Sequence, residues 1–342
     1  MTDFSELEPI PERAPIDGPA LADEVVASHQ PVVLRGQFRD WPIVAKAREG
    51  HGEDYVRSFG NSHTVRAFRG AADMGGRYFY DDDFRGVNFE RIELTLGALF
   101  DELGANADRD MPSALYAGAI PLSGPLAGLL AANPNHLLPA SVEQLSSLWI
   151  GNRGVTATHY DLPQNIAVVV AGSRRFTLFP PEQLRNLYLG PLDSTLAGQP
   201  VSTVHLHEPD FDRFPRFRDA LDAAMTAVLE PGDALYLPSM WFHNVEALTD
   251  LGMLINFWWR DAAAHMFTPM FTMLHAMLSI KGLSDHERDC WRRMFDQYVF
   301  ETDGDPMAHL PEHAKGFFGD MDPDKAARLR LYLLQSLGGK PR

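Results

Sequence analysis

The chain is short of cysteine, of long apolar runs and of basic residues, and each shortage excludes a class of protein. Its single cysteine, Cys290, cannot form a disulfide within the chain. No stretch reaches the roughly 18 uninterrupted apolar residues of a membrane-spanning helix. The opening residues MTDFSELEPIPER have neither the basic nor the apolar region of a secretory signal. We therefore expect a cytoplasmic protein without a membrane partner.

Positive charge is also scarce. The chain has 30 Lys and Arg residues against 46 Asp and Glu residues, which gives a formal net charge of −16. Proteins that hold nucleic acids usually present clustered basic residues, so this balance predicts no nucleic-acid partner. Apolar residues make up 45% of the 342 residues, which is enough for a sizeable core. The composition is typical of a folded globular protein.

Three regions differ in their pattern of residues. Residues 1–111 mix helical and strand-like segments and predict an α/β lead-in that packs on the core. Residues 112–260 consist of short apolar or alternating runs separated by turn residues such as EPGD at 230–233, a pattern typical of a β-sandwich or barrel. Residues 261–342 have helical spacing throughout. The sequence predicts a mainly β protein with flanking helices.

A candidate metal site begins at His159 and Asp161. In an extended segment, residues two apart face the same side, so this imidazole and carboxylate can reach one ion. The spacing alone is weak, because 13 histidines and 46 acidic residues in this length give about two such triplets by chance. The other triplet is His51-x-Glu53. An ordinary surface turn therefore remains an alternative reading of the His159 segment.

His243 is the best candidate for a third ligand, because it follows the strand-like run DALYLP and so falls near a strand end. Two histidines and one carboxylate leave positions open on a six-coordinate iron. A core or surface histidine beside Trp241 is the alternative. His205 and His207 also share an expected strand face, but they run into a loop rich in proline and aspartate, so a loop role or a role at the substrate rim is favoured over metal binding.

These motifs, in this order, resemble those of a known family. The segments LWIGNRGVTATHYDLPQNIAVVVAGSRRFTLFPP, EPGDALYLPSMWFHNVE and LINFWW are similar to the Jumonji C or cupin-8 (cupin-like) proteins, and most to the asparaginyl hydroxylase type that inhibits hypoxia-inducible factor. The resemblance covers about residues 112–260. It implies a double-stranded β-helix (cupin or jelly roll) that binds Fe(II) through His159, Asp161 and His243 and uses 2-oxoglutarate as co-substrate.

The resemblance also implies roles for residues around that site. Thr156 and Asn165 stand where family members contact the co-substrate, and Tyr116 stands where a tyrosine hydroxyl reaches its distal carboxylate. Asn256 and Trp258 fit the strand that follows the last ligand. The implied activity is a dioxygenase that uses dioxygen to hydroxylate a C–H bond of a protein, peptide or small-molecule substrate.

One residue departs from the family pattern. Arg174 stands where the asparaginyl hydroxylase type has a lysine that pairs with the distal carboxylate. A guanidinium holds a carboxylate through two parallel hydrogen bonds, so the function can survive, although a different oxo-acid or a degraded site is an alternative. A hydrolytic zinc enzyme and a non-catalytic cupin that binds a metal or ligand as a sensor or scaffold are further alternatives, but the His-Glu-x-x-His string of zinc hydrolases is absent from the sequence.

Two regions outside the motifs carry weaker expectations. Residues 78–88 combine aromatic residues with three consecutive aspartates, Asp81 to Asp83, and either rim the mouth of the site or form a solvated turn. The helices after residue 261 resemble the family's dimerisation element in position, which implies a homodimer.

Overall fold

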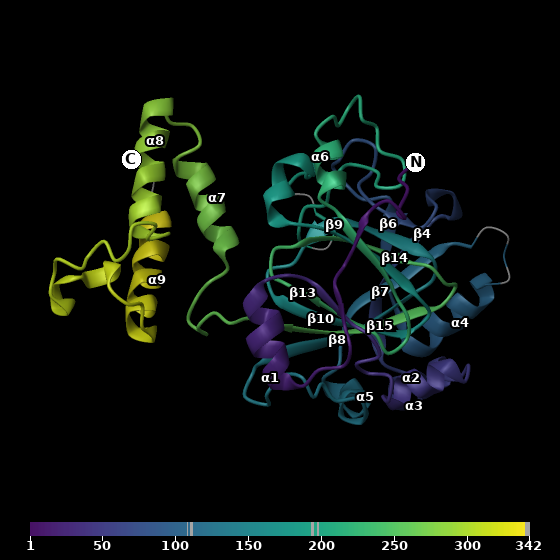
Figure 1. Ribbon diagram of the computed structural model, residues 1–342. Helices are drawn as coiled ribbons and strands as arrows, with labels where there is room; N and C mark the ends of the chain where they lie inside the picture. The colour runs from purple at the N-terminus through teal and green to yellow at the C-terminus, as the bar shows by residue number, and fades with distance from the viewer. Residues whose placement is uncertain (108, 110–111, 193–194, 197, 339–342) are drawn as a thin grey trace. The chain divides into compact units, whose positions relative to one another are not determined.

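The computed structural model describes residues 1–107, 109, 112–192, 195–196 and 198–338 (Figure 1). The chain divides into two compact units, Met1–Arg260 and Asp261–Arg342. The domain boundary predicted at residues 111 and 112 lies partly outside the described residues, and the three-part division stays a prediction. No described helix is long and apolar enough to cross a membrane.

The first unit is built on two β-sheets. The larger has nine strands in the order β2-β3-β13-β10-β15-β8-β7-β4-β6. Along that order the strands are β2 Glu12–Arg13, β3 Val32–Leu34, β13 Ala234–Leu237, β10 Gln164–Ala171, β15 Gly252–Trp259, β8 Gln144–Gly151, β7 Ala114–Pro121, β4 Thr64–Gly70 and β6 Phe89–Thr95. Its central strand β10 is buried along its whole length, as expected for the continuous apolar run that encodes it.

The smaller sheet has six strands in the order β1-β12-β11-β14-β9-β5. Along that order they are β1 Glu8–Pro9, β12 Met225–Leu229, β11 Arg174–Phe179, β14 Phe242–Ala247, β9 Gly154–Tyr160 and β5 Arg77–Tyr78. The central pairs β11 with β14 and β14 with β9 are antiparallel. Two mixed sheets with helices beside them confirm the predicted fold class.

Apolar side chains fill the space between the two sheets. Ala167 and Val169 of β10 and Leu235 of β13 pack there against Phe176 and Leu178 of β11. The alternate side chains of the same strands face the opposite way, because successive side chains in a strand point to opposite faces. The interior between the sheets is therefore where the side chains of β9, β10, β11, β14 and β15 meet.

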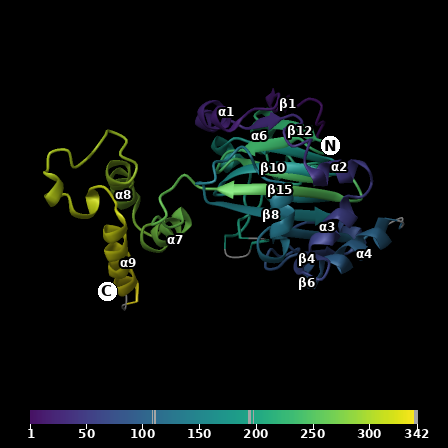
Figure 2. The ribbon, with the colours of Figure 1, turned by 90° about the horizontal axis from the view of Figure 1, so that it is seen from below.

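Helices cover the outer face of the larger sheet, as two views of the ribbon show (Figures 1 and 2). Side chains of the helices α2 to α5 and of β8, β10 and β15 form the largest apolar cluster among the described residues. The helices are α1 Gly18–Ala20, α2 Pro42–Arg48, α3 Gly52–Gly60, α4 Leu96–Ala107 and α5 Ala127–Ala132, and α6 Phe217–Asp222 precedes β12. After α1 the chain continues as a π-helical turn over Leu21–Val25 and a 3-10 turn over Val26–Ser28.

The second unit contains α7 Pro269–Ser279, α8 Asp285–Tyr298 and α9 Pro323–Leu337. Ser284 and Glu287 form a capping box at the start of α8, and Asp322 caps α9. None of these three helices contains a buried residue. Their exposed apolar side chains include Phe271, Leu278, Trp291, Leu331, Tyr332 and Leu334.

Candidate metal centre

The three candidate ligands converge at one end of the smaller sheet. His159 on β9 pairs directly with His243 on β14 across the ladder, and Asp161 follows the end of β9. Their potential ligand atoms all lie within 4.8 Å of one another. The ring centroids of the two histidines are 4.2 Å apart, and Nε2 of His243 lies 3.6 Å from Oδ2 of Asp161. Two imidazoles and one carboxylate thus face a single point.

The backbone fixes the orientation of both imidazoles. Nδ1 of His159 lies 2.8 Å from the carbonyl oxygen of Ala157, and Nδ1 of His243 lies 3.1 Å from that of Trp241. A carbonyl oxygen only accepts hydrogen bonds, so each neutral ring carries its hydrogen on Nδ1. The lone pair is then on Nε2, which is the arrangement that metal-binding histidines adopt when a carbonyl holds the other nitrogen.

The environment also sets protonation states that suit a metal. Burial, together with the neighbouring His243, lowers the pKa of His159 to about 4. Burial alone raises the pKa of Asp161, but the hydrogen bond and charge of His243 outweigh it and keep that pKa below its usual value. At neutral pH His159 is therefore neutral and Asp161 is ionised. A metal requires these forms of its ligands.

These residues line a cavity of about 70 Å³ between the sheets. Every residue that the sequence singled out for the metal or the co-substrate lines it. They are Tyr116, Thr156, His159, Asp161, Asn165, Arg174, His243, Asn256 and Trp258. Their positions place them together, while their roles as ligands or co-substrate contacts stay predictions.

Arg174 is the positively charged group of this cavity. Its side chain is 4% exposed and forms no ion pair with any described residue. The hydroxyl of Tyr116 is its hydrogen-bond partner, and its Nε is buried without one. Burial lowers the pKa of the Arg174 guanidinium and raises that of the Tyr116 hydroxyl. A buried cation whose partner is neutral is electrostatically incomplete and suits an anionic ligand.

Two amide side chains and one indole form a hydrogen-bonded network on the cavity wall that lies opposite β11, the strand of Arg174. Nε1 of Trp149 donates to Oδ1 of Asn256 over 2.7 Å, and Nδ2 of Asn256 donates to Oδ1 of Asn165 over 3.3 Å. Nε1 of Trp258 is buried without a partner. The sequence reasoning did not single out Trp149, although its place in the alternating run SSLWIGN puts it on the inner face of β8.

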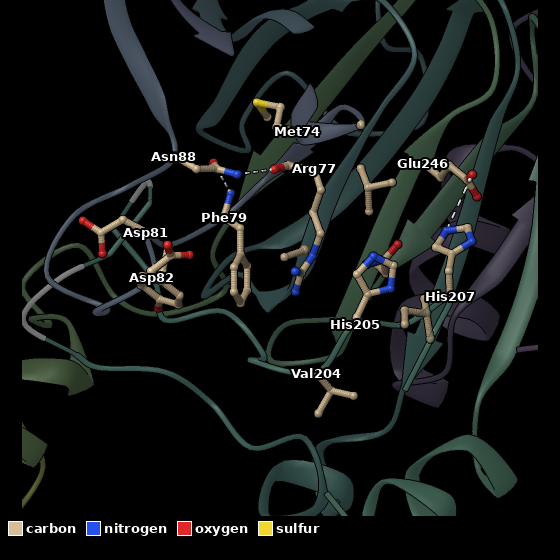
Figure 3. Close-up of a pocket in the computed structure, with 16 residues that line it drawn as sticks. Met74, Arg77, Phe79, Asp81, Asp82, Asn88, Val204, His205, His207 and Glu246 are labelled. Carbon is tan, nitrogen blue, oxygen red and sulfur yellow. Dashed lines mark hydrogen bonds and ion pairs between the residues drawn. The ribbon is translucent and has the colours of Figure 1, made fainter. Parts of the chain in front are cut away.

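A second, larger pocket of about 550 Å³ contains the residues that were expected at the rim. Phe79, Asp81 and Asp82 of the aromatic loop line it together with His205 and His207 (Figure 3). None of these residues lines the metal cavity. These residues therefore line a pocket on the other side of the smaller sheet, and the lining of the metal cavity gives no support to the expected rim role.

Comparison with known proteins assigns the family. The model of the cupin-like domain matches residues 19–265, and the chain therefore belongs to the cupin-like domain family. This confirms the predicted membership. The match includes every strand of the two sheets except β1 and β2, together with all candidate site residues, so the cavity lies within the family domain.

Individual relatives share a shorter stretch. The chain is 33% identical over 106 residues to lysine-specific demethylase JMJ31 of Arabidopsis thaliana, which is 31% of this chain and 19% of that protein. It is 35% identical over 110 residues to tRNA wybutosine-synthesizing protein 5 of Mus musculus, 32% of each chain. It is 32% identical over 122 residues to lysine-specific demethylase 8 of Xenopus tropicalis, 35% of this chain and 26% of that protein. The matched segments thus span about a fifth to a third of these relatives.

Proposed function

We propose that the protein is an Fe(II)- and 2-oxoglutarate-dependent dioxygenase that hydroxylates a C–H bond. The observation that carries the proposal is one buried cavity that holds two imidazoles, one carboxylate and a guanidinium without an acidic partner among the described residues. Relatives named as demethylases and as wybutosine-synthesizing proteins support oxygenase chemistry in this family. None of these relatives is named as an asparaginyl hydroxylase, so the predicted similarity to that type stays a prediction.

The donor set fits iron. Two histidines and one carboxylate with further positions open are typical of non-haem Fe(II) oxygenases. His159, Asp161 and His243 would hold the ion, and the carbonyl oxygens of Ala157 and Trp241 would keep both rings in place. Bound iron with 2-oxoglutarate supplies the oxidising power, since one atom of dioxygen enters the substrate C–H bond and the other enters succinate, with loss of carbon dioxide.

The cavity also fits 2-oxoglutarate. Arg174 offers a planar guanidinium that can bind the distal carboxylate through two parallel hydrogen bonds, and the Tyr116 hydroxyl beside it offers a third donor. Thr156, which bonds the Tyr116 hydroxyl, is on the same wall. Asn165, Asn256 and Trp258 complete the polar lining, and the buried indole hydrogen of Trp258 remains available to a ligand oxygen.

A pair of matched variants tests the proposal. His159→Ala and Asp161→Ala should abolish Fe(II) binding, measured anaerobically, and succinate formation from 2-oxoglutarate. His51→Ala is the control, because His51-x-Glu53 has the same spacing but its histidine side chain is 63% exposed on α3's N-terminal side. Full succinate formation by His159→Ala would refute the assignment. Binding of Fe(II) and 2-oxoglutarate without any turnover would favour the non-catalytic cupin.

We further propose that the protein acts in the cytoplasm and that its substrate is a protein, a peptide or a small molecule rather than a nucleic acid. We also propose that residues 261–342 form the interface of a homodimer. The helices of this unit bury no residue of their own, and many of their large apolar side chains are exposed. A second copy of the same unit would cover that surface. Light scattering at micromolar concentration should give twice the mass of 38.2 kDa, and a monomer would refute the dimer.

A further inference from the structure

The larger pocket lies on the outer face of the smaller sheet (Figure 3). Val155 and Ala157 of β9 and Asn244 of β14 line it, and they alternate along these strands with Thr156 and His243 of the metal cavity. The two cavities share no lining residue. The outer pocket is therefore a separate site, and its residues take no part in the proposed binding of the metal or the co-substrate.

Arg77 is the distinctive side chain of this pocket. Its guanidinium carbon lies 3.6 Å from the ring centroid of Phe79, and its Nη2 is buried without a hydrogen-bond partner. It forms no ion pair with any residue in the described part of the chain. Burial, which no neighbouring anion offsets, lowers the pKa of Arg77 to about 10. A cation in this state is costly to the free protein and gains most from an anionic ligand.

Local hydrogen bonds hold Arg77 and Phe79 in place. Oδ1 of Asn88 accepts the backbone N–H of Phe79 over 2.9 Å, and Nδ2 of Asn88 donates to the carbonyl oxygen of Arg77 over 2.9 Å (Figure 3). One amide thus fixes the backbone on both sides of Tyr78. The guanidinium and the ring beneath it are therefore positioned before any ligand arrives, which lowers the entropic cost of binding.

His205 supplies a second donor to the pocket. Its Nδ1 accepts the backbone N–H of Glu208 over 3.1 Å, so the neutral ring carries its hydrogen on Nε2. Burial, followed by the charges of Arg77 and His207, lowers the pKa of His205 and favours this neutral form. An anion that meets Arg77 in this pocket can therefore also accept a hydrogen bond from His205.

The acidic residues of the pocket do not neutralise Arg77. Glu246 is bound by Arg175 over 2.6 Å and lies 3.6 Å from Nε2 of His207. Oδ1 of Asp81 accepts a hydrogen bond from the backbone N–H of Arg85 over 3.1 Å, so this carboxylate binds within its own loop. Asp82 lines the pocket but forms no ion pair with Arg77. These charges restrict where a ligand's anionic group can lie, and Arg77 with His205 is the place that remains.

We propose that the outer pocket binds the oxyanion group, a carboxylate or a phosphate, of a small organic molecule. Arg77 is the charged anchor and His205 the second donor. The apolar side chains of Met74, Phe79 and Leu206 in the same pocket contact the remainder of the ligand. The volume of about 550 Å³ suits a molecule of small-metabolite size.

Calorimetric titration of the full chain with three aromatic probes tests this site. Phenyl phosphate and benzoate carry the two oxyanions on the same ring, and phenol is the neutral control. We expect saturable binding of at least one anion, no binding of phenol, and a loss of at least tenfold in affinity in Arg77→Ala. Arg77→Lys should retain part of the affinity, and His205→Ala should weaken it. Arg85→Ala is the matched control, since it removes the same charge from an 87% exposed side chain of the same loop.

The outcomes of these titrations distinguish a phosphorylated ligand from a carboxylic acid, and they test the outer pocket separately from the metal centre. Preference for phenyl phosphate indicates a phosphorylated ligand, and preference for benzoate indicates a carboxylic acid. Phenol that binds as well as the anions, unchanged affinity in Arg77→Ala, or no saturation at millimolar concentration would overturn the site. Fe(II) binding by the Arg77 variants shows whether the fold survives, because His159, Asp161 and His243 lie on the other face. Should Arg77→Ala fail to fold, Arg77→Lys and His205→Ala decide.

Discussion

Arg174→Met should stabilise the metal-free protein and weaken co-substrate binding by roughly a hundredfold, and the two effects have one cause. The free protein keeps a guanidinium at 4% exposure with only the neutral Tyr116 hydroxyl beside it. Methionine fills a similar volume without a charge. Replacement of poorly compensated buried charges by apolar residues typically gains about 1–4 kcal/mol. The Tyr116 hydroxyl keeps Thr156 as a partner, so the change does not leave it orphaned.

The loss of binding follows from the same guanidinium. Two charge-assisted hydrogen bonds to a carboxylate, at about 1.5 kcal/mol each, give about 3 kcal/mol. This corresponds to roughly a hundredfold weaker affinity for 2-oxoglutarate. The assay is calorimetry of the protein loaded with a redox-inert divalent metal, beside urea denaturation of the metal-free protein. Arg174→Lys should lie within about tenfold of the wild type, because it keeps the charge but not the planar fork.

Arg175→Met is the control on the next residue of the same strand. Arg175 faces the other side of the sheet, where it binds Glu246 over 2.6 Å and stacks on Phe4. Its loss should lower stability and leave the affinity for 2-oxoglutarate unchanged. Unchanged affinity in Arg174→Met, or a metal-free variant less stable than the wild type, would refute the reasoning.

Three further predictions concern stability. The folded-state pKa of His159, about 4, lies below the usual histidine value of about 6.5, so the metal-free protein should have its full stability above pH 6.5. Urea denaturation should show a loss of about 3 kcal/mol as the pH falls towards 4. A pH profile that His159→Gln does not flatten would contradict this. Asn256→Ala should cost about 1–3 kcal/mol because Trp149 loses its acceptor, whereas the same change made in Trp149→Phe, which has no donor to leave unpaired, should cost less in the same assay. Ser284→Ala should lower the helical content or thermal midpoint of the second unit through a loss of about 1 kcal/mol at the cap of α8, and an unchanged midpoint would argue against it.

The sequence predicted the fold class because its signals are local. The continuous run NIAVVVA became β10, buried on both faces, and the turn EPGD separates β12 from β13 as its proline and glycine indicate. The strands β4 and β6, in contrast, extend the nine-stranded sheet from the region predicted as an α/β lead-in. Pairing between distant strands is a non-local property that hydrophobic periodicity does not encode.

The two chance-level triplets show what sequence reasoning can and cannot separate. His159-x-Asp161 and His51-x-Glu53 have the same spacing, but the former ends a strand opposite His243, whereas His51 is exposed before α3. Only the order of accompanying motifs distinguished them in the sequence. The shared strand face expected of His205 and His207 was wrong, because both histidines lie in a loop, where the alternation of strand side chains does not apply.

Both candidate sites depend on an arginine that buries one guanidinium nitrogen without a hydrogen-bond partner, Nη2 in Arg77 and Nε in Arg174, in a chain whose net charge is −16. An excess of 16 acidic residues could in principle have paired Arg77 and Arg174, as it pairs Arg69 with Glu102 and Arg57 with Asp101. Neither Arg77 nor Arg174 forms an ion pair with a described residue, although an acidic residue lies near each pocket. A guanidinium kept apart from available carboxylates costs folding free energy, and sites that bind ligands are where such costs are commonly retained. The same electrostatic pattern on the two faces of one sheet is therefore an argument for two anion sites rather than one.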